Sequence, residues 1–265
     1  MDYNMFIDEL ASDSSAPGGG SASAMAGIIA ASLTSMVAGL TLNKKGYESV
    51  NKSMSDIITE AGQIRNRLEV LMKEDTDAFL KLMDAMKMPK GTQDEKDARK
   101  IEIERSMKGA IVTPWKIASQ CHRIMRIAFM LLREGNSNAI TDAGASMKIA
   151  RAAIESSLLN VKINISYIKN EKFKDEERLK MKLFLEDVES IYSKGINMLS
   201  DDLKIEVSRV LHSNAIRNSE SFRSRYVPIF HVLHHTVAVF ALNSIHHKRK
   251  DQCSQKLWGQ CDPEG

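Results

Sequence analysis

Hydrophobic positions recur at spacings of three and four along most of the first 200 or so residues. The repeat is clearest from residue 48 to about residue 86, where it passes through Val50, Met54, Ile57, Ile58, Ala61, Ile64, Leu68, Met72, Phe79, Leu82, Met83 and Met86. This spacing is the period of an amphipathic helix. Since so long a helix needs other helices to cover its apolar side, the pattern indicates a helical bundle.

Turn residues and charge clusters separate the other predicted helices. We expect these helices over residues 5–10, 22–42, 93–108, 113–132, 141–168 and 173–200. Pro89 and Gly91 end the long helix. Pro114 is expected to open a new helix, because proline favours the first helical turn. No strand-like alternation competes, so residues 1–203 predict an all-α fold, an antiparallel bundle of long helices.

Charge and composition set residues 204–265 apart. The chain of 265 residues has a net charge of +3, but residues 204–265 hold nine Lys and Arg against five Asp and Glu, which leaves the rest near neutral. A near-neutral body argues against nucleic-acid binding. Six of the seven histidines also fall in residues 204–265, without a carboxylate or cysteine at metal-ligand spacing. We expect a functional domain over 1–203, a basic, His-rich extension over 204–265, and no metal site.

The segment from Ala22 to Leu42 contains no charged residue and approaches membrane-spanning length. Its five Ser and Thr residues, and the lack of a basic flank before it, favour a buried helix of the bundle instead. The first 15 residues are acidic and lack the apolar core of a signal peptide. We therefore expect a cytoplasmic protein with no membrane partner and with its three cysteines reduced.

A glycine-rich turn, Pro17-Gly18-Gly19-Gly20-Ser21, precedes the uncharged helix. Consecutive glycines lose the most backbone entropy on folding, so they suit places where the backbone must closely approach another group. The unpaired N–H groups at the start of the following helix suit an anion or a developing negative charge. A simple turn before a tightly packed helix explains the same residues, and both interpretations stay open.

A second polar turn runs from Gly135 to Asp142 and includes Asn136 and Asn138. Asp142 occupies the position expected for a helix N-cap, where a carboxylate accepts backbone N–H groups. Those hydrogen bonds would lower its pKa and make it a poor base, whereas burial against a ligand would raise the pKa and suit proton transfer. The spacing alone leaves both roles open.

Three stretches together resemble one enzyme family. Pro17–Ser21 with the uncharged helix and Asn43-Lys44-Lys45-Gly46-Tyr47 form the first, residues 135–143 the second, and residues 160–164 the third. In order and separation they resemble the formimidoyltetrahydrofolate cyclodeaminase / methenyltetrahydrofolate cyclohydrolase family over about residues 5–202. Residues 204–265 fall outside the resemblance.

The resemblance implies an all-helical, homodimeric enzyme that acts on a tetrahydrofolate derivative, including polyglutamylated forms. In the cyclodeaminase reaction, N10 attacks the formimino carbon on N5, and ammonia leaves to give 5,10-methenyltetrahydrofolate. In the alternative, the cyclohydrolase reaction, water opens the methenyl ring to give 10-formyltetrahydrofolate. The family name favours the cyclodeaminase. The resemblance implies no metal and no cofactor beyond the tetrahydrofolate substrate.

The residues in these stretches can be assigned roles under the resemblance. Asp142 would be the catalytic carboxylate, and the side chains of Asn136, Asn138 and Asn164 would bind the pterin edge. The turn residues Gly18, Gly19, Gly20 and Ser21 would present backbone N–H groups, and Lys44, Lys45 and Tyr47 would hold the glutamate tail. Asn164 as a core polar group, and the lysines as a solvated helix end, remain alternatives.

The enzyme interpretation requires the two polar turns to lie side by side. A non-catalytic helical assembly module is the second alternative, because a glycine turn and long helices also suit self-association.

Overall fold

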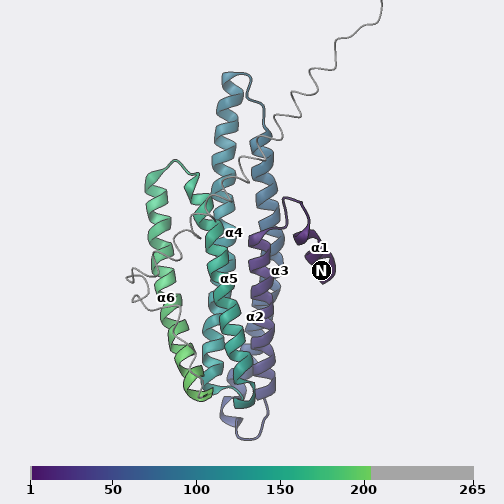
Figure 1. Cartoon of the computed structure of the whole chain (residues 1–265), viewed down its shortest axis with the longest axis vertical. Helices are drawn as coiled ribbons and strands as arrows, with labels where there is room; N and C mark the ends of the chain where they lie inside the picture. The colour runs from purple at the N-terminus through teal and green to yellow at the C-terminus, as the bar shows by residue number, and fades with distance from the viewer. Residues whose placement is uncertain (1, 204–265) are drawn as a thin grey trace, which may run out of the picture. The chain divides into compact units, whose positions relative to one another are not determined.

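The computed structural model describes residues 2–203, and the predicted extension over 204–265 lies outside these residues. The described residues contain six helices and no strand, so the predicted all-α fold is confirmed. In Figure 1 successive long helices run up and down beside one another. Their bounds are α1 Tyr3–Ala11, α2 Gly19–Thr41, α3 Asn51–Lys87, α4 Gln93–Glu134, α5 Ile140–Ser166 and α6 Glu171–Leu203, with short 3-10 turns η1 Glu48–Val50 and η2 Ser137–Ala139.

Helix α2 packs between α3 and α5 and also contacts α4. Small residues allow this close packing: a Cβ added at Gly27 would lie 2.6 Å from the Cys121 sulfur of α4 and 2.9 Å from Leu68 of α3. Thr34 of α2 and Ser146 of α5 hydrogen-bond each other at 2.8 Å in the buried interior. Among the described residues, α2 alone is long and apolar enough to cross a membrane, with 44% of that window buried inside the bundle.

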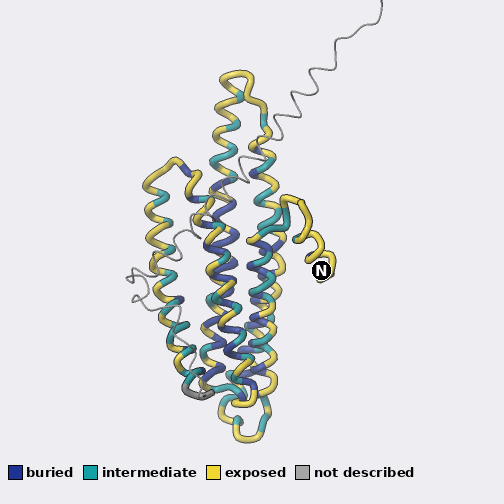
Figure 2. Tube along the Cα trace, in the orientation of Figure 1, coloured by how far each residue is buried: buried dark blue, intermediate teal, exposed yellow. Residues whose placement is uncertain are grey.

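The core lies where α2, α3, α4 and α5 meet, and burial is densest along the middle of these helices (Figure 2). Helix α6 covers one side of α4 and α5. Its Glu177 accepts a hydrogen bond from the Trp115 indole at 2.6 Å, and Glu189 pairs with Arg151 at 2.7 Å. Cys121 lies fully inside this core as a free thiol, and burial raises its pKa to about 12.

One predicted helix boundary is wrong. Residues 93–108 and 113–132 form a single helix, α4, with Pro114 inside it. An internal proline leaves the carbonyl four residues earlier without its helical partner. Here that carbonyl, on Ala110, accepts the Asn164 side-chain amide of α5 at 3.0 Å. A residue from a neighbouring helix therefore supplies the hydrogen bond that Pro114 cannot make.

Candidate functional site

The glycine-rich turn opens α2 directly. Gly18 is the N-cap of the helix, without a side-chain cap, and Gly19 and Gly20 form its first turn. A Cβ at Gly20 would lie 2.6 Å from Cγ of Asp75 and closer still to both of its carboxylate oxygens. Gly20 is therefore required by the close approach of a carboxylate from α3.

The Ser21 hydroxyl holds Asp75 against the start of α2. The Ser21 hydroxyl lies 3.3 Å from the Asp75 carboxylate, 3.4 Å from the Met72 carbonyl and 3.4 Å from the Thr76 hydroxyl. Burial raises the pKa of the Asp75 carboxyl, and hydrogen bonding from Ser21 offsets only part of this effect. A partly buried carboxyl with a raised pKa suits proton transfer near neutral pH.

Asn160 of α5 borders the same turn. Its side-chain nitrogen lies 3.8 Å from the Cβ position of Gly19 and donates to the Ser156 carbonyl at 3.2 Å. The turn is thus flanked by a carboxylate from α3 and a carboxamide from α5. We call Gly18, Gly19, Gly20, Ser21, Asp75, Thr76 and Asn160 the glycine-turn cluster.

A second cluster joins the end of α2 to the α4–α5 connection. The Asn136 side-chain oxygen accepts hydrogen bonds from the Lys44 ammonium and the Asn138 backbone N–H, while its amide donates to the Leu40 carbonyl at 3.1 Å. Its own backbone N–H donates to Thr41 at 2.8 Å. Asn136 is 7% exposed and ties two connections together, so most of its polar capacity is already used.

Tyr47 completes this asparagine-turn cluster, which consists of Lys44, Tyr47, Asn136, Ser137 and Asn138. The Ser137 N–H donates to the Tyr47 hydroxyl at 3.1 Å, and the Lys44 ammonium lies 5.4 Å from the centre of the Tyr47 ring. Hydrogen bonding with the Ser137 side chain, and then with its backbone, lowers the pKa of Tyr47. The cluster offers an exposed hydroxyl beside an ammonium group.

The predicted N-cap role of Asp142 is wrong. The turn η2 comes first, Ala139 is the N-cap of α5, and Asp142 lies within the first helical turn. Among residues 2–203, Asp142 has no side-chain hydrogen bond or ion pair, and it is partly exposed. Lys45 is exposed, and its side chain likewise has no such partner within that range. Both residues lie near the asparagine-turn cluster along the chain, and their predicted roles stay predictions.

The two clusters lie at opposite ends of α2. The glycine turn starts this helix of 23 residues, whereas Asn136 contacts its last residues. At 1.5 Å per residue the separation is about 30 Å. Within one chain the two turns therefore do not lie side by side, because the α4–α5 connection returns to the far end of α2, and the predicted juxtaposition would need a neighbouring subunit.

Asn164, predicted to bind the pterin edge, has the structural role given above. Its amide donates to Ala110 and completes α4 across Pro114. Of the two asparagines in the third stretch of the resemblance, it is Asn160 that lies at the glycine turn.

Neither Asp75 nor Asn160 was predicted from the sequence as a site residue. A signal for Asp75 exists: the apolar repeat of α3 passes from Met72 to Phe79, and the register between them requires an apolar residue at position 75 or 76. A carboxylate and a hydroxyl occupy these positions instead. A charged residue in a core-facing register marks a functional candidate.

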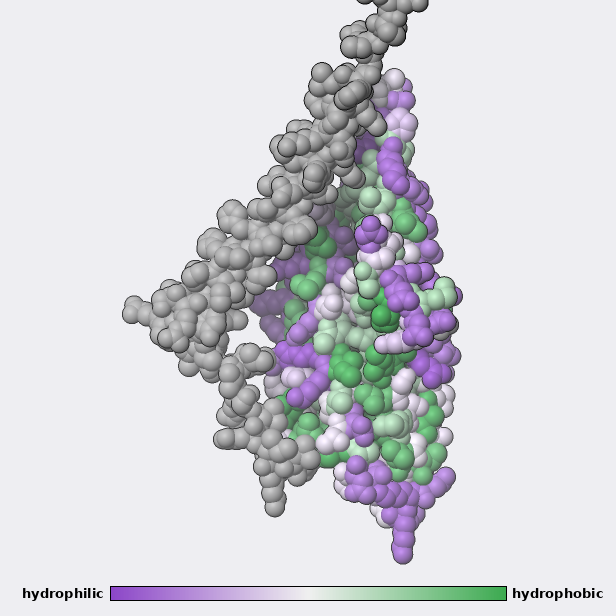
Figure 3. Space-filling model, turned by 45° about the vertical axis from the view of Figure 1, so that its right-hand side comes forward, coloured by the Kyte–Doolittle hydropathy of each residue, from purple (hydrophilic) through white to green (hydrophobic). Residues whose placement is uncertain are grey.

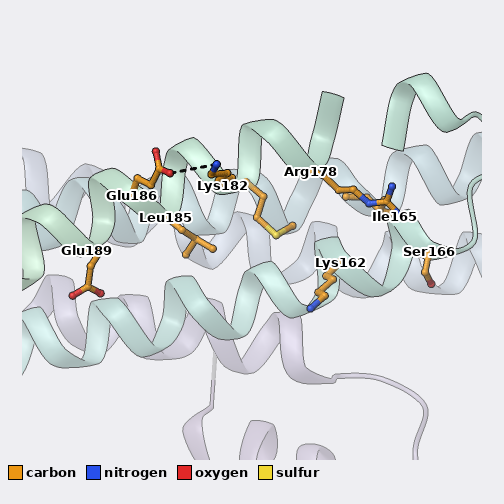
Figure 4. Close-up of a pocket in the computed structure, with 9 residues that line it drawn as sticks. Lys162, Ile165, Ser166, Arg178, Lys182, Leu185, Glu186 and Glu189 are labelled. Carbon is orange, nitrogen blue, oxygen red and sulfur yellow. Dashed lines mark ion pairs between the residues drawn. The ribbon is translucent and has the colours of Figure 1, made fainter. Parts of the chain in front are cut away.

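A separate groove of about 740 Å³ lies between α5 and α6 (Figure 4). No residue predicted for the site lines it, and two of its charged side chains, Lys182 and Glu186, pair with each other at 4.0 Å. It is lined by Lys162, Ile165, Ser166, Arg178, Met181, Lys182, Leu185, Glu186 and Glu189.

Similar proteins are found by sequence and by structure. The chain is 36% identical over 175 residues to a methenyltetrahydrofolate cyclohydrolase of Methylorubrum extorquens, covering 66% of this chain and 84% of that protein. It is 31% identical over 182 residues to the chicken formimidoyltransferase-cyclodeaminase, covering 69% of this chain but only 34% of the relative. The chain thus spans about a third of the length of that relative.

A solved structure agrees. The crystal structure of formiminotetrahydrofolate cyclodeaminase from Thermotoga maritima matches with a TM-score of 0.65 and 27% identity, over 77% of this chain and 96% of that chain. The family model described as formiminotransferase-cyclodeaminase matches residues 2–183, which include both clusters. The chain therefore belongs to the formiminotransferase-cyclodeaminase family.

Proposed function

We propose that this protein is a formimidoyltetrahydrofolate cyclodeaminase in which Asp75 moves the protons. The observation that carries the proposal is the Asp75 carboxyl, partly buried and packed against Gly20, with its pKa raised by burial. The family membership supports the tetrahydrofolate substrate. Asp75 takes the catalytic role that the family resemblance implied for Asp142.

The reaction needs a group that both accepts and donates a proton. N10 attacks the carbon of the protonated formimino group, forming a C–N bond and a tetrahedral intermediate. The proton on N10 must then leave, and the former formimino nitrogen must gain one before its bond to carbon breaks and ammonia departs. One carboxyl can carry this proton from N10 to the leaving nitrogen. Its raised pKa makes the carboxylate a stronger base for the first of these transfers.

Hydrolysis of 5,10-methenyltetrahydrofolate is the second candidate. The observation that favours it is the 36% identity to a methenyltetrahydrofolate cyclohydrolase over most of that protein. The chemistry concerns the same carbon: water adds and loses one proton to the carboxylate, the bond from this carbon to N5 then opens as the added hydroxyl becomes the formyl carbonyl, and the hydroxyl proton passes to N5. Asp75 would serve as the base in this direction, so the site suits both reactions.

A homodimer completes the proposal. The outer face of α2 carries exposed apolar residues, Ile29 at 45%, Met36 at 42% and Leu40 at 51% exposure. On α5, Leu159 and Ile163 are also exposed, beside Asn160, which contacts the start of α2. Figure 3, with the α2 and α3 side turned forward, shows hydrophobic surface along the middle of the body. A second copy of the chain would cover this face.

An antiparallel pairing of the two α2 helices would reunite the clusters. A two-fold axis across α2 brings the glycine turn of one chain to the asparagine-turn cluster of the other, and it juxtaposes opposite helix dipoles. Lys44, Lys45 and Tyr47 would then hold the glutamate tail of a folate bound beside the partner's Asp75. Asn138 and Asp142 would face the same ligand.

The experiment offers both 5-formimino- and 5,10-methenyltetrahydrofolate and follows the methenyl absorbance. We expect it to appear with the first substrate; disappearance with the second would identify the cyclohydrolase. Asp75→Asn should lower kcat at least about 100-fold, in line with general acid–base contributions. The matched control is Asp77→Asn, an exposed carboxylate two residues along the same helix. Equal rates in both variants would refute the role of Asp75.

Two further expectations belong to the proposal. The enzyme uses no cofactor beyond its folate substrate, and it works in the cytoplasm. Dialysis against a chelator that leaves kcat unchanged would support the first.

A further inference from the structure

Asn160 is a polar residue without an evident structural task. It lies inside α5, where asparagine is a weak helix former. Its side-chain nitrogen donates only to the Ser156 carbonyl of its own helix, a group that the helix itself already pairs. Among residues 2–203, the side-chain oxygen has no hydrogen-bond donor.

The position of Asn160 relative to Asp75 gives the carboxamide a use. Asn160 borders Gly19, and the Asp75 carboxylate borders Gly20, the next residue of the turn. The two side chains therefore approach adjacent residues of the same turn from α5 and α3. A substituent bound over Gly19 and Gly20 would meet both.

We infer that the Asn160 side-chain oxygen binds the nitrogen that leaves the substrate, and orients it toward Asp75. This inference rests on the proposed function. The formimino nitrogen carries N–H groups, and a carboxamide oxygen accepts one of them without competing for the proton in transfer. Fixing this nitrogen keeps its lone pair directed at the Asp75 proton. In the hydrolytic direction the same oxygen would hold the attacking water.

Asn164 provides a matched comparison on the same helix, one turn further along. The Asn164 amide donates to the Ala110 carbonyl and is held by packing, whereas the Asn160 carboxamide borders the turn through its nitrogen, and its oxygen accepts no hydrogen bond from residues 2–203. Replacement of Asn160 by Ala should therefore lower kcat without lowering stability. Replacement of Asn164 by Ala should lower stability and leave kcat unchanged.

The test measures three quantities on Asn160→Ala: kcat with the formimino substrate, the Kd for tetrahydrofolate without a one-carbon group, and Tm. A hydrogen bond to a group that becomes charged predicts a fall in kcat of about 10- to 100-fold. The Kd for unsubstituted tetrahydrofolate should stay within about twofold, since the group that Asn160 binds is absent. Tm should not fall. Asn160→Asp, which keeps the oxygen, should recover activity relative to Asn160→Leu, which keeps only the shape.

Three results would overturn the inference. Unchanged kcat in Asn160→Ala would show that the carboxamide does not act on the reacting group. An equal loss of tetrahydrofolate affinity would indicate a general binding role. Equal activities of Asn160→Asp and Asn160→Leu would exclude the oxygen as acceptor. An inactive wild-type enzyme with both substrates refutes the proposed function itself, and this inference falls with it.

Discussion

Asn164 and Pro114 should be energetically coupled although they lie on different helices. Pro114 removes the hydrogen bond to the Ala110 carbonyl, and the Asn164 amide restores it at 3.0 Å. Replacing Asn164 by Ala leaves that carbonyl, on a residue only 8% exposed, without its donor. Such a loss costs about 1–3 kcal/mol, through the missing bond and the unpaired carbonyl.

The same substitution should cost much less when residue 114 can donate. In a Pro114→Ala background the new backbone N–H reaches the Ala110 carbonyl as in any α-helix. Asn164→Ala then deletes a hydrogen bond that the carbonyl no longer needs. The double-mutant cycle should give a coupling free energy of about 1–2 kcal/mol, within the range seen for residues that share a partner.

Urea unfolding followed by circular dichroism on the wild type, both single variants and the double variant measures this coupling. The slope of the unfolding free energy against urea should be the same in all four, so that midpoints compare directly. Equal costs of Asn164→Ala in both backgrounds would refute the reasoning. Activity of the Asn164 variant separates this role from the predicted pterin contact, because packing alone predicts that kcat is retained.

Three further outcomes follow from the same contacts. Asp75→Asn should unfold at higher Tm than the wild type at pH 7.5 and at an unchanged Tm near pH 3.5. Because burial raises the pKa of Asp75, its contribution to folded-state stability is complete below its unfolded pKa of about 3.9 and is lost as pH rises through its folded pKa. Gly20→Ala should displace the Asp75 carboxylate and lower kcat at least about tenfold, whereas Gly62→Ala on α3, where the added Cβ meets nothing within 4 Å, should not; equal effects would contradict the close-approach argument. Met36→Glu should give monomers in sedimentation experiments and abolish turnover if the α2 face joins two chains, and a dimer that persists would exclude this face.

The long helices could be predicted from the sequence because burial follows their apolar period. Helix α3 begins three residues after the expected start and otherwise follows the pattern. Pro114 misled the prediction, since the donor that replaces its N–H comes from Asn164, 50 residues further along the chain. No local pattern carries that information.

The site was harder to predict because it depends on which helix ends meet. The glycine turn was identified as a place of close approach, and the approaching group is Asp75, which interrupts an apolar repeat. The asparagine turn was identified as polar, yet its contacts lie with Lys44 and Thr41 at the far end of α2. Residue types could mark both turns, but only the packing of α2 against its neighbours could place them.

The buried thiol of Cys121 gives the bundle a built-in reporter of its own opening. Enclosed by Gly27 and Leu68 and with a pKa of about 12, it cannot react with an alkylating reagent until α2 separates from α4. In a chain with Cys253 and Cys261 changed to serine, the labelling rate of Cys121 would therefore measure how often the four central helices separate. A tetrahydrofolate ligand that binds at the start of α2 and stabilises its packing would lower this labelling rate.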